Sequence, residues 1–339
     1  MGFVSKLMGL FGAAAAAPKA SAPDQPSRAR QARNATVRDD WLEVTQPNFY
    51  GQAHRSPNRH WVVGCNDSDG TGHGGHRESG NGRVMLVDHQ SDKVMHELTC
   101  FARPTGAAVS DAGNYIVHDC GLGSSLQGDV VAIGLDGRER YRRRYGANVF
   151  NIGLSKCGRY AAVQTANAPS SDSNLLEVLD LDRSCTVFSV HPETGWADRY
   201  LFDVGVDGQF KALSVLFNQL GKFRYSDKGE FRDKKSFQGA RLNKGDYSTK
   251  VMAARDLIKD EPTPDSAKKA LSTADAALVE GGKDNAEWGS IAHRVRGESY
   301  ELLGQMPEAL AAYEKALSLN PKVGVQKRAT ALRKVLGTG

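Results

Sequence analysis

The sequence predicts an α+β multidomain protein in which a β-strand region precedes an α-helical region. A short phrase that joins a turn to a strand recurs four times in the first two thirds of the chain, and a strand that is apolar on both faces follows most copies. After about Lys244 the apolar period changes from two to 3.6, the period of a helix. The 339 residues allow about two domains, and the net charge of +5 is too small to indicate a general nucleic-acid binder.

The repeated phrase has the pattern Ser-x-x-Gly-x-aromatic and stands before an apolar run. It is clearest at residues 155–160 and 110–115, and degenerate copies occupy 56–61, where Arg59 replaces the glycine, and 205–210, which lacks the serine. Glycine accepts the positive φ of a tight turn, and an aromatic residue suits the start of a half-buried strand. The copies begin roughly 45 to 55 residues apart, enough for one four-stranded unit each.

Residues 83–87, 129–133 and 175–179 are predicted strands with apolar side chains on both faces. Such a strand must be covered on both sides, as happens when sheets stack face against face. Asp136-Gly137 is a strong hairpin-turn signal, and residues 226–229 play the same part in the fourth repeat.

These features resemble the repeats of WD-like and YVTN-like β-propellers over about residues 38–240. The resemblance implies a small propeller of about four blades. Because four blades are few for these families, we consider a compact ring, an open partial ring, half of a ring completed by a second copy, and a two-sheet sandwich.

The helical region, residues 245–336, begins with two predicted helices. The first runs through Tyr247 to Ile258, and the second is capped by Asp265 or Ser266 and stops at Gly281-Gly282. The next segment resembles a tetratricopeptide repeat, because its small, aromatic and proline residues have that spacing: Gly297, Tyr300, Gly304, Ala309, Tyr313, Ala316 and Pro321. His293 and Arg296 depart from the pattern, which prefers Trp and Leu there. A single repeat needs neighbours, so we expect two such hairpins and a capping helix over about 322–336.

The N-terminal residues divide into two predicted segments. Residues 1–17 are expected to form an amphipathic segment that contacts a membrane surface or a partner, with a secretory signal as the alternative. Residues 18–37 lack large apolar side chains and are expected to be a disordered linker. The five cysteines include no Cys-x-x-Cys pair and suit free thiols in a reducing compartment, so we expect a cytoplasmic protein, with peripheral membrane contact as an option.

The loop 66–83 has the most unusual composition of the chain. It contains Asp67, Asp69, His73 and His76 among many glycines, and such oxygen and nitrogen ligands suit a divalent metal. The pattern lacks the remaining ligands of a calcium loop or a zinc site, so we favour an ordinary inter-strand loop and expect no cofactor. A metal-dependent propeller enzyme of hydrolase or lyase type is the alternative.

An arginine-rich strand carries Arg138, Arg142, Arg143 and Arg144 between aromatic residues. Such a strand can bind the phosphates and bases of nucleic acid. It equally suits a solvated outermost strand whose charges protect a sheet edge, and we favour that interpretation. Nucleic acid is the third functional hypothesis, and we do not expect it as a partner.

No catalytic motif is present, so we predict a non-enzymatic scaffold that binds proteins or peptides. The tetratricopeptide resemblance implies a groove lined by outward positions of the first helix of the repeat. In this sequence those positions are Ile291, Arg294, Glu298, Glu301 and Leu302. Their mixture predicts a polar contact of mixed charge. Homo-oligomerisation remains an open alternative.

Overall fold

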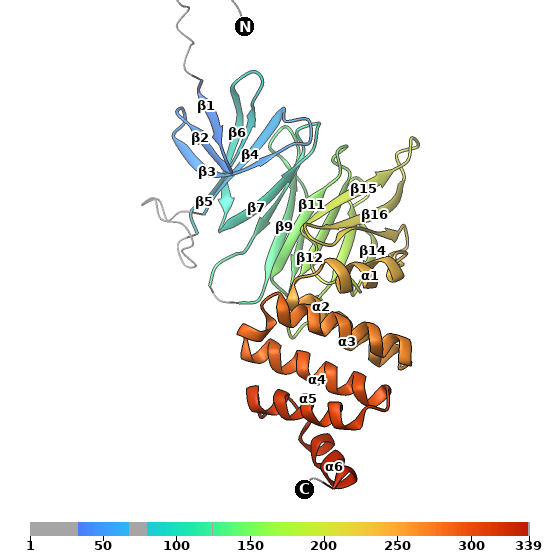
Figure 1. Cartoon of the computed structure of the whole chain (residues 1–339). Helices are drawn as coiled ribbons and strands as arrows, with labels where there is room; N and C mark the ends of the chain where they lie inside the picture. The colour runs from blue at the N-terminus through green and yellow to red at the C-terminus, as the bar shows by residue number, and fades with distance from the viewer. Residues whose placement is uncertain (1–32, 68–79, 124, 338–339) are drawn as a thin grey trace, which may run out of the picture. The chain divides into compact units, whose positions relative to one another are not determined.

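The computed structural model describes residues 33–67, 80–123 and 125–337. The residues from Asn34 onward belong to one compact unit, in which strands come first and helices follow (Figure 1). Among the described residues, no helix combines the length and the apolar character that crossing a membrane requires.

The β region consists of four antiparallel sheets, each built from strands that pair in chain order. The first sheet contains β1 (Ala35–Arg38), β2 (Trp41–Val44), β3 (Phe49–Arg55), β4 (Trp61–Asn66), β5 (Gly82–Asp88) and β6 (Lys93–Phe101). The second contains β7 (Pro104–Val109), β8 (Tyr115–Asp119), β9 (Gly128–Ile133) and β10 (Glu139–Tyr145), and the third contains β11 (Val149–Leu154), β12 (Tyr160–Thr165), β13 (Leu176–Asp180) and β14 (Cys185–Val190). The fourth contains β15 (Arg199–Val204), β16 (Phe210–Phe217) and β17 (Gly221–Ser226). Four blade-like sheets followed by helices confirm the predicted fold class.

The repeated phrase forms the turn that leads into β4, β8, β12 and β16, one strand in each sheet, and it also joins neighbouring sheets. Inside the phrase, the Ser155 hydroxyl accepts the backbone N–H of Tyr160 at 2.9 Å. The Tyr160 hydroxyl then donates to the carbonyl of Gly208, in the next copy of the phrase, at 3.0 Å. In the first copy the Trp61 indole N–H donates to the carbonyl of Asp111 at 3.2 Å.

The glycine of the repeated phrase is required for two reasons: its backbone has a positive φ, and a neighbouring side chain leaves no room for a Cβ. Gly158 has φ of 78°, and a Cβ added there would lie 2.9 Å from the hydroxyl of Ser110 in the preceding copy. The degenerate first copy keeps the left-handed turn, since Arg59 has φ of 58°. The glycine therefore lets one turn pack on the turn before it.

The two faces of the central strands belong to different cores. On β8, Tyr115 and Val117 pack against the first sheet, whereas Ile116 packs against the third. On β12, Tyr160 and Ala162 face the fourth sheet. Face-to-face stacking thus accounts for strands that are apolar on both sides.

The stack is an open series of sheets. Neighbouring sheets contact one another in chain order, and among the described residues the first and fourth sheets form no comparable contact. The outward face of the first sheet is sealed by its own hairpin, with Leu42 of β2 packed over Val62 and Met85. The outward face of β15 and β17 carries the exposed Arg199, Asp203, Lys222 and Arg224. Within the described residues the sheets thus do not close into a compact ring in a single chain, and completion of the ring by a second copy stays a prediction.

Two differences from the sequence prediction lie at the ends of the β region. β1 begins at Ala35, inside the segment 18–37 predicted as linker, because the Asp92 carboxylate accepts the backbone N–H groups of Asn34 and Ala35 at 2.7 and 2.8 Å. The fourth sheet lacks a regular fourth strand: only the Tyr225–Phe231 bridge remains, and helix α1 (Lys234–Lys244) follows. Phe237 of α1 is buried against the fourth sheet, so the helix begins before residue 240.

The helical region continues with α2 (Tyr247–Asp260), α3 (Pro264–Val279), a 3₁₀ turn (Gly282–Asp284), α4 (Ala286–Leu302), α5 (Met306–Leu319) and α6 (Gln326–Leu336). Each of these α-helices packs on the next one in the chain. The N-cap of α3 is Thr263, which forms a reciprocal capping box with Ser266, whereas the sequence predicted Asp265 or Ser266 as the cap.

The hairpin of α4 and α5 packs through the small and aromatic residues seen in the sequence. Tyr313 is fully buried, and a Cβ added at Gly297 would lie 2.3 Å from its ring. Glycine at this position thus lets the two helices approach across a tyrosine. The observed helices match the predicted two hairpins and capping helix.

Candidate partner-binding groove

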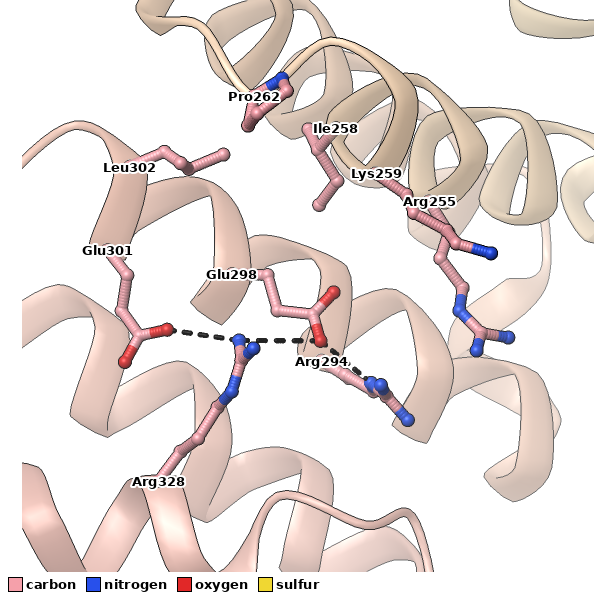
Figure 2. Close-up of a pocket in the computed structure, with 9 residues that line it drawn as sticks. All are labelled: Arg255, Ile258, Lys259, Pro262, Arg294, Glu298, Glu301, Leu302 and Arg328. Carbon is pink, nitrogen blue, oxygen red and sulfur yellow. Dashed lines mark hydrogen bonds and ion pairs between the residues drawn. The ribbon is translucent and has the colours of Figure 1, made fainter.

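A groove of about 540 Å³ opens between helices α2, α4 and α6. Its lining comprises four cations, two carboxylates and three apolar residues: Arg255, Ile258, Lys259, Pro262, Arg294, Glu298, Glu301, Leu302 and Arg328. Figure 2 shows these side chains around the groove, on α4 and its neighbours. The volume lies in the range of a ligand pocket, and the open form suits a protein segment.

The α4 wall of the groove is held by an ion-pair network. Arg294 Nε lies 3.0 Å from Glu298 Oε1, one helical turn on, and its Nη1 donates to the Val323 carbonyl at 3.1 Å. Arg328 of α6 reaches Glu298 at 3.5 Å and Glu301 at 3.1 Å (Figure 2). These bonds fix the carboxylates and tie α6 and the preceding loop to α4.

Tyr313 of α5 is hydrogen-bonded to two members of the same network. Its hydroxyl donates to Glu301 at 2.7 Å and accepts from Arg328 at 3.2 Å. Burial and the Glu301 carboxylate raise the pKa of the tyrosine. Tyr313 therefore both fills the core of the α4–α5 hairpin and holds the polar side chains of the α4 wall in place.

The α2 wall carries positive charge that the groove does not neutralise. Arg255 and Lys259 lie one helical turn apart, and within the described residues neither forms an ion pair or side-chain hydrogen bond. Glu298 and Glu301 are already paired with Arg294 and Arg328 on the opposite wall. The groove therefore has a net charge of +2, displayed on α2.

The other end of the groove is apolar. Ile258 and Pro262 lie on the α2 side and Leu302 on the α4 side, at the end away from Arg255 (Figure 2). Leu302 is 36% exposed, which is high for a leucine at the end of a packed helix. The groove thus combines a cationic wall with an apolar contact surface.

Four of the five residues predicted from sequence line this groove: Arg294, Glu298, Glu301 and Leu302. Ile291 does not, because it packs between the core of α2, α3 and α4 and the core of α5 and α6. Sequence reasoning missed Arg255, Lys259 and Arg328, which come from other helices. The sequence could place these three residues on helices, but it could not predict that α2, α4 and α6 meet around one groove.

The two departures from the tetratricopeptide pattern make polar contacts. Arg296 forms an ion pair with Asp275 of α3 at 2.9 Å, and its guanidinium lies 3.2 Å from the His293 ring. Burial, together with the charges of Arg296 and Lys315, lowers the pKa of His293 to about 4. A polar link to α3 thus replaces an apolar one.

Most of the predicted metal loop lies outside the described residues. Asp67 is described, whereas Asp69, His73 and His76 are not. Among the described parts of the chain, no group of three His, Cys, Asp or Glu side chains is arranged to hold a metal ion. The metal-site hypothesis stays a prediction.

The arginine-rich strand is β10, the edge strand of the second sheet, as its charge pattern indicated. Arg142 and Arg144 bind Asp129 at 3.2 and 2.7 Å, and Arg143 binds the buried Glu177 at 2.6 Å. Arg138 lies 3.7 Å from Asp136. A nucleic acid would have to compete with these carboxylates for each arginine.

Comparison with known proteins adds one assignment for part of the chain. The tetratricopeptide repeat family matches residues 290–323. No curated protein sequence matches the chain. A chain in the "Crystal Structure of Mitotic Checkpoint Complex" is 10% identical, with a TM-score of 0.36, over 56% of this chain and 58% of that chain, so this chain spans little more than half of it. That likeness is too low to support an argument, and the chain is similar to the tetratricopeptide family over the hairpin that forms one wall of the groove.

Proposed function

We propose that this chain is a non-enzymatic interaction protein whose helical groove binds an acidic segment of a partner protein. The observation that supports this is the pair of cations on α2, Arg255 and Lys259, facing an open groove whose carboxylates are already neutralised. Positive charge without a partner attracts carboxylates and disfavours basic segments. The stack of sheets, in this account, is the rigid support and a further surface of a scaffold.

The shape of the groove suggests the form of the bound segment. A carboxylate of the partner pairs with Arg255 or Lys259, while an apolar side chain packs on Leu302 and Pro262. The bound segment therefore carries acidic residues beside a leucine-like side chain. Because only a few helices line the groove, we expect affinity in the range of about 1 to 100 μM.

The proposal is tested by fluorescence anisotropy with a labelled peptide that contains Glu and Asp residues around one leucine. Binding should weaken as salt rises, since the Debye length falls to about 8 Å at 0.15 M. A peptide with Gln and Asn in place of the acids is the matched probe. Equal binding of both peptides by the whole chain would contradict the proposal.

The protein variant Arg255→Ala with Lys259→Ala separates the groove from general charge. We expect about a tenfold loss of affinity for the acidic peptide, because both uncompensated cations are removed. Lys268→Ala with Lys269→Ala is the control, since these residues are exposed on α3 outside the groove and the change in net charge is identical. Equal losses of peptide affinity in the two variants would mean that binding depends on the net charge of the protein and not on the groove.

A further inference from the structure

A second site lies in the β region, between the first and second sheets and far in sequence from the groove. Cys120 follows β8 and lines a cavity of about 340 Å³ together with Cys100, Asp119, Arg142 and Arg144. The thiol is half-buried, so small molecules reach it.

Three side chains form a closed set of contacts at this thiol. Cys120 Sγ lies 3.5 Å from His118 Nε2 and 3.1 Å from Thr105 Oγ1, while His118 Nδ1 lies 3.2 Å from the same threonine hydroxyl. Two proton arrangements use these three contacts: in the neutral one the thiol donates to Thr105, Thr105 to His118 Nδ1 and His118 Nε2 to the sulfur, and in the charged one both nitrogens of an imidazolium donate and the threonine donates to a thiolate. The closed set of contacts therefore lets His118 accept the proton of the thiol without any side chain moving.

The backbone around the thiol is fixed by neighbouring groups. The Asp119 carboxylate accepts N–H groups of Ala102, Arg103 and Gly121 at 2.9, 2.6 and 3.1 Å. The register of β7 on β8 shifts between Pro104 and Gly106, and this irregularity places Thr105 opposite the thiol. The contacts are thus built by the strand pairing and do not depend on one mobile side chain.

Electrostatics at the site favours the ionised thiol. Burial opposes ionisation, but the hydrogen bond and charge of His118, followed by hydrogen bonds from Thr105 and Arg103, lower the pKa of Cys120 to about 6. Asp119 and Asp129 are the carboxylates that line the cavity, and Arg142 and Arg144 neutralise Asp129. The thiolate is therefore the form expected at neutral pH.

We propose that Cys120 is a nucleophilic modification site that small hydroperoxides oxidise to a sulfenic acid. The thiolate sulfur attacks one peroxide oxygen, an S–O bond forms and the O–O bond breaks. The sulfur loses two electrons to the peroxide, and the departing oxygen takes a proton from the His118 imidazolium and leaves as water or an alcohol. Arg103, whose side chain hydrogen-bonds the thiol, supplies a positive charge that favours the departing oxygen.

The test is competitive alkylation of the whole chain with limiting iodoacetamide at pH 6.5, read by peptide mass spectrometry. Cys100, Cys157 and Cys185 are more exposed than Cys120 and serve as internal references. A thiol with pKa near 6 has far more thiolate at this pH than one at the ordinary value, and its lower intrinsic nucleophilicity offsets part of the gain. We therefore expect Cys120 to react about five- to tenfold faster than the reference cysteines. Reaction rates that follow exposure, with Cys120 slowest of the four, would overturn the proposal.

Thr105→Val supplies a matched variant at an exposed position, where folding is not at risk. It should move the midpoint of the pH profile of Cys120 alkylation above 6 while leaving the rate at Cys157 unchanged. Hydrogen peroxide followed by dimedone should then label Cys120 first in the unaltered chain and more slowly in the variant. Dimedone labelling of Cys157 before Cys120, or an unshifted midpoint, would contradict the role assigned to this cluster.

Discussion

Single residues in this chain often serve the fold and the groove together. Tyr313 fills the space left by Gly297 and holds the Glu301 carboxylate at the groove wall. Glu298 is only 13% exposed, yet two arginines from different elements reach it. Substitutions here are therefore expected to change stability and binding together, whereas Arg255 and Lys259 can be changed without disturbing the core.

Gly297→Ala should destabilise the α4–α5 hairpin. The added methyl group would lie 2.3 Å from the Tyr313 ring, and that ring is held by its hydroxyl bonds to Glu301 and Arg328. We expect a loss of about 2 kcal/mol in the free energy of unfolding, measured by urea titration. Gly239→Ala in α1 is the control: nothing lies within 4 Å of its added Cβ, so a gain of about 0.5 kcal/mol is expected. A loss at Gly239 as large as at Gly297 would contradict the steric explanation.

At the scale of elements, the repeated phrase is a joint between sheets as well as a turn. Sequence alone predicted the turn and the following strand, because glycine and the aromatic residue are local signals. The contacts from Trp61 to Asp111 and from Tyr160 to Gly208 join different repeats and have no local signal. The same reason explains why β1 and α1 were missed: β1 depends on Asp92, and α1 on the fourth sheet around Phe237.

Tyr160→Phe tests the joint. The Tyr160 hydroxyl accepts the Phe210 backbone N–H at 3.2 Å and donates to the Gly208 carbonyl at 3.0 Å, so its removal leaves both backbone groups without this partner. We expect a loss of about 1 to 2 kcal/mol in unfolding free energy, measured by chemical denaturation. Tyr50→Phe, at a ring that is 55% exposed, should change stability by less than about 0.5 kcal/mol. Equal effects of the two substitutions would argue against the joint.

At the scale of the whole molecule, the chain is an open stack of sheets followed by an α-helical series. Sequence predicted this order and most helices, because the shift in apolar period extends over long segments. It predicted the α4 wall of the groove, but not the residues of α2 and α6, which require the relative placement of the three helices, and not the cluster at Cys120, which requires the pairing of β7 with β8. Both sites join residues from separate elements, and only the packed structure brings them together.

The stability of the whole chain should fall as pH drops from about 6.5 to 4. Burial lowers the pKa of His54 to about 4, against the opposing charge of Asp40, and His293 has a similarly lowered pKa. Between pH 6.5 and pH 4 these two histidines bind protons in the unfolded chain but not in the folded chain, so acid favours unfolding. For His54 the full effect is on the order of 3 kcal/mol.

His54→Gln should flatten this part of the stability profile, measured by urea titration at several pH values. The exposed His191→Gln is the matched control and should leave the slope unchanged. A slope between pH 6.5 and 4 that is identical in the unaltered chain and the His54 variant would rule out this histidine as its source.

The central claim, recognition of an acidic segment in the groove, is tested most directly by comparing proteins captured from native extract by three versions of the whole chain. These are the unaltered chain, Arg255→Glu with Lys259→Glu, and Lys268→Glu with Lys269→Glu on α3. We predict that the unaltered chain and the α3 variant retain the same partners, which carry acidic segments, and that the groove variant loses them. Retention of the same proteins by all three would place recognition elsewhere and contradict the account.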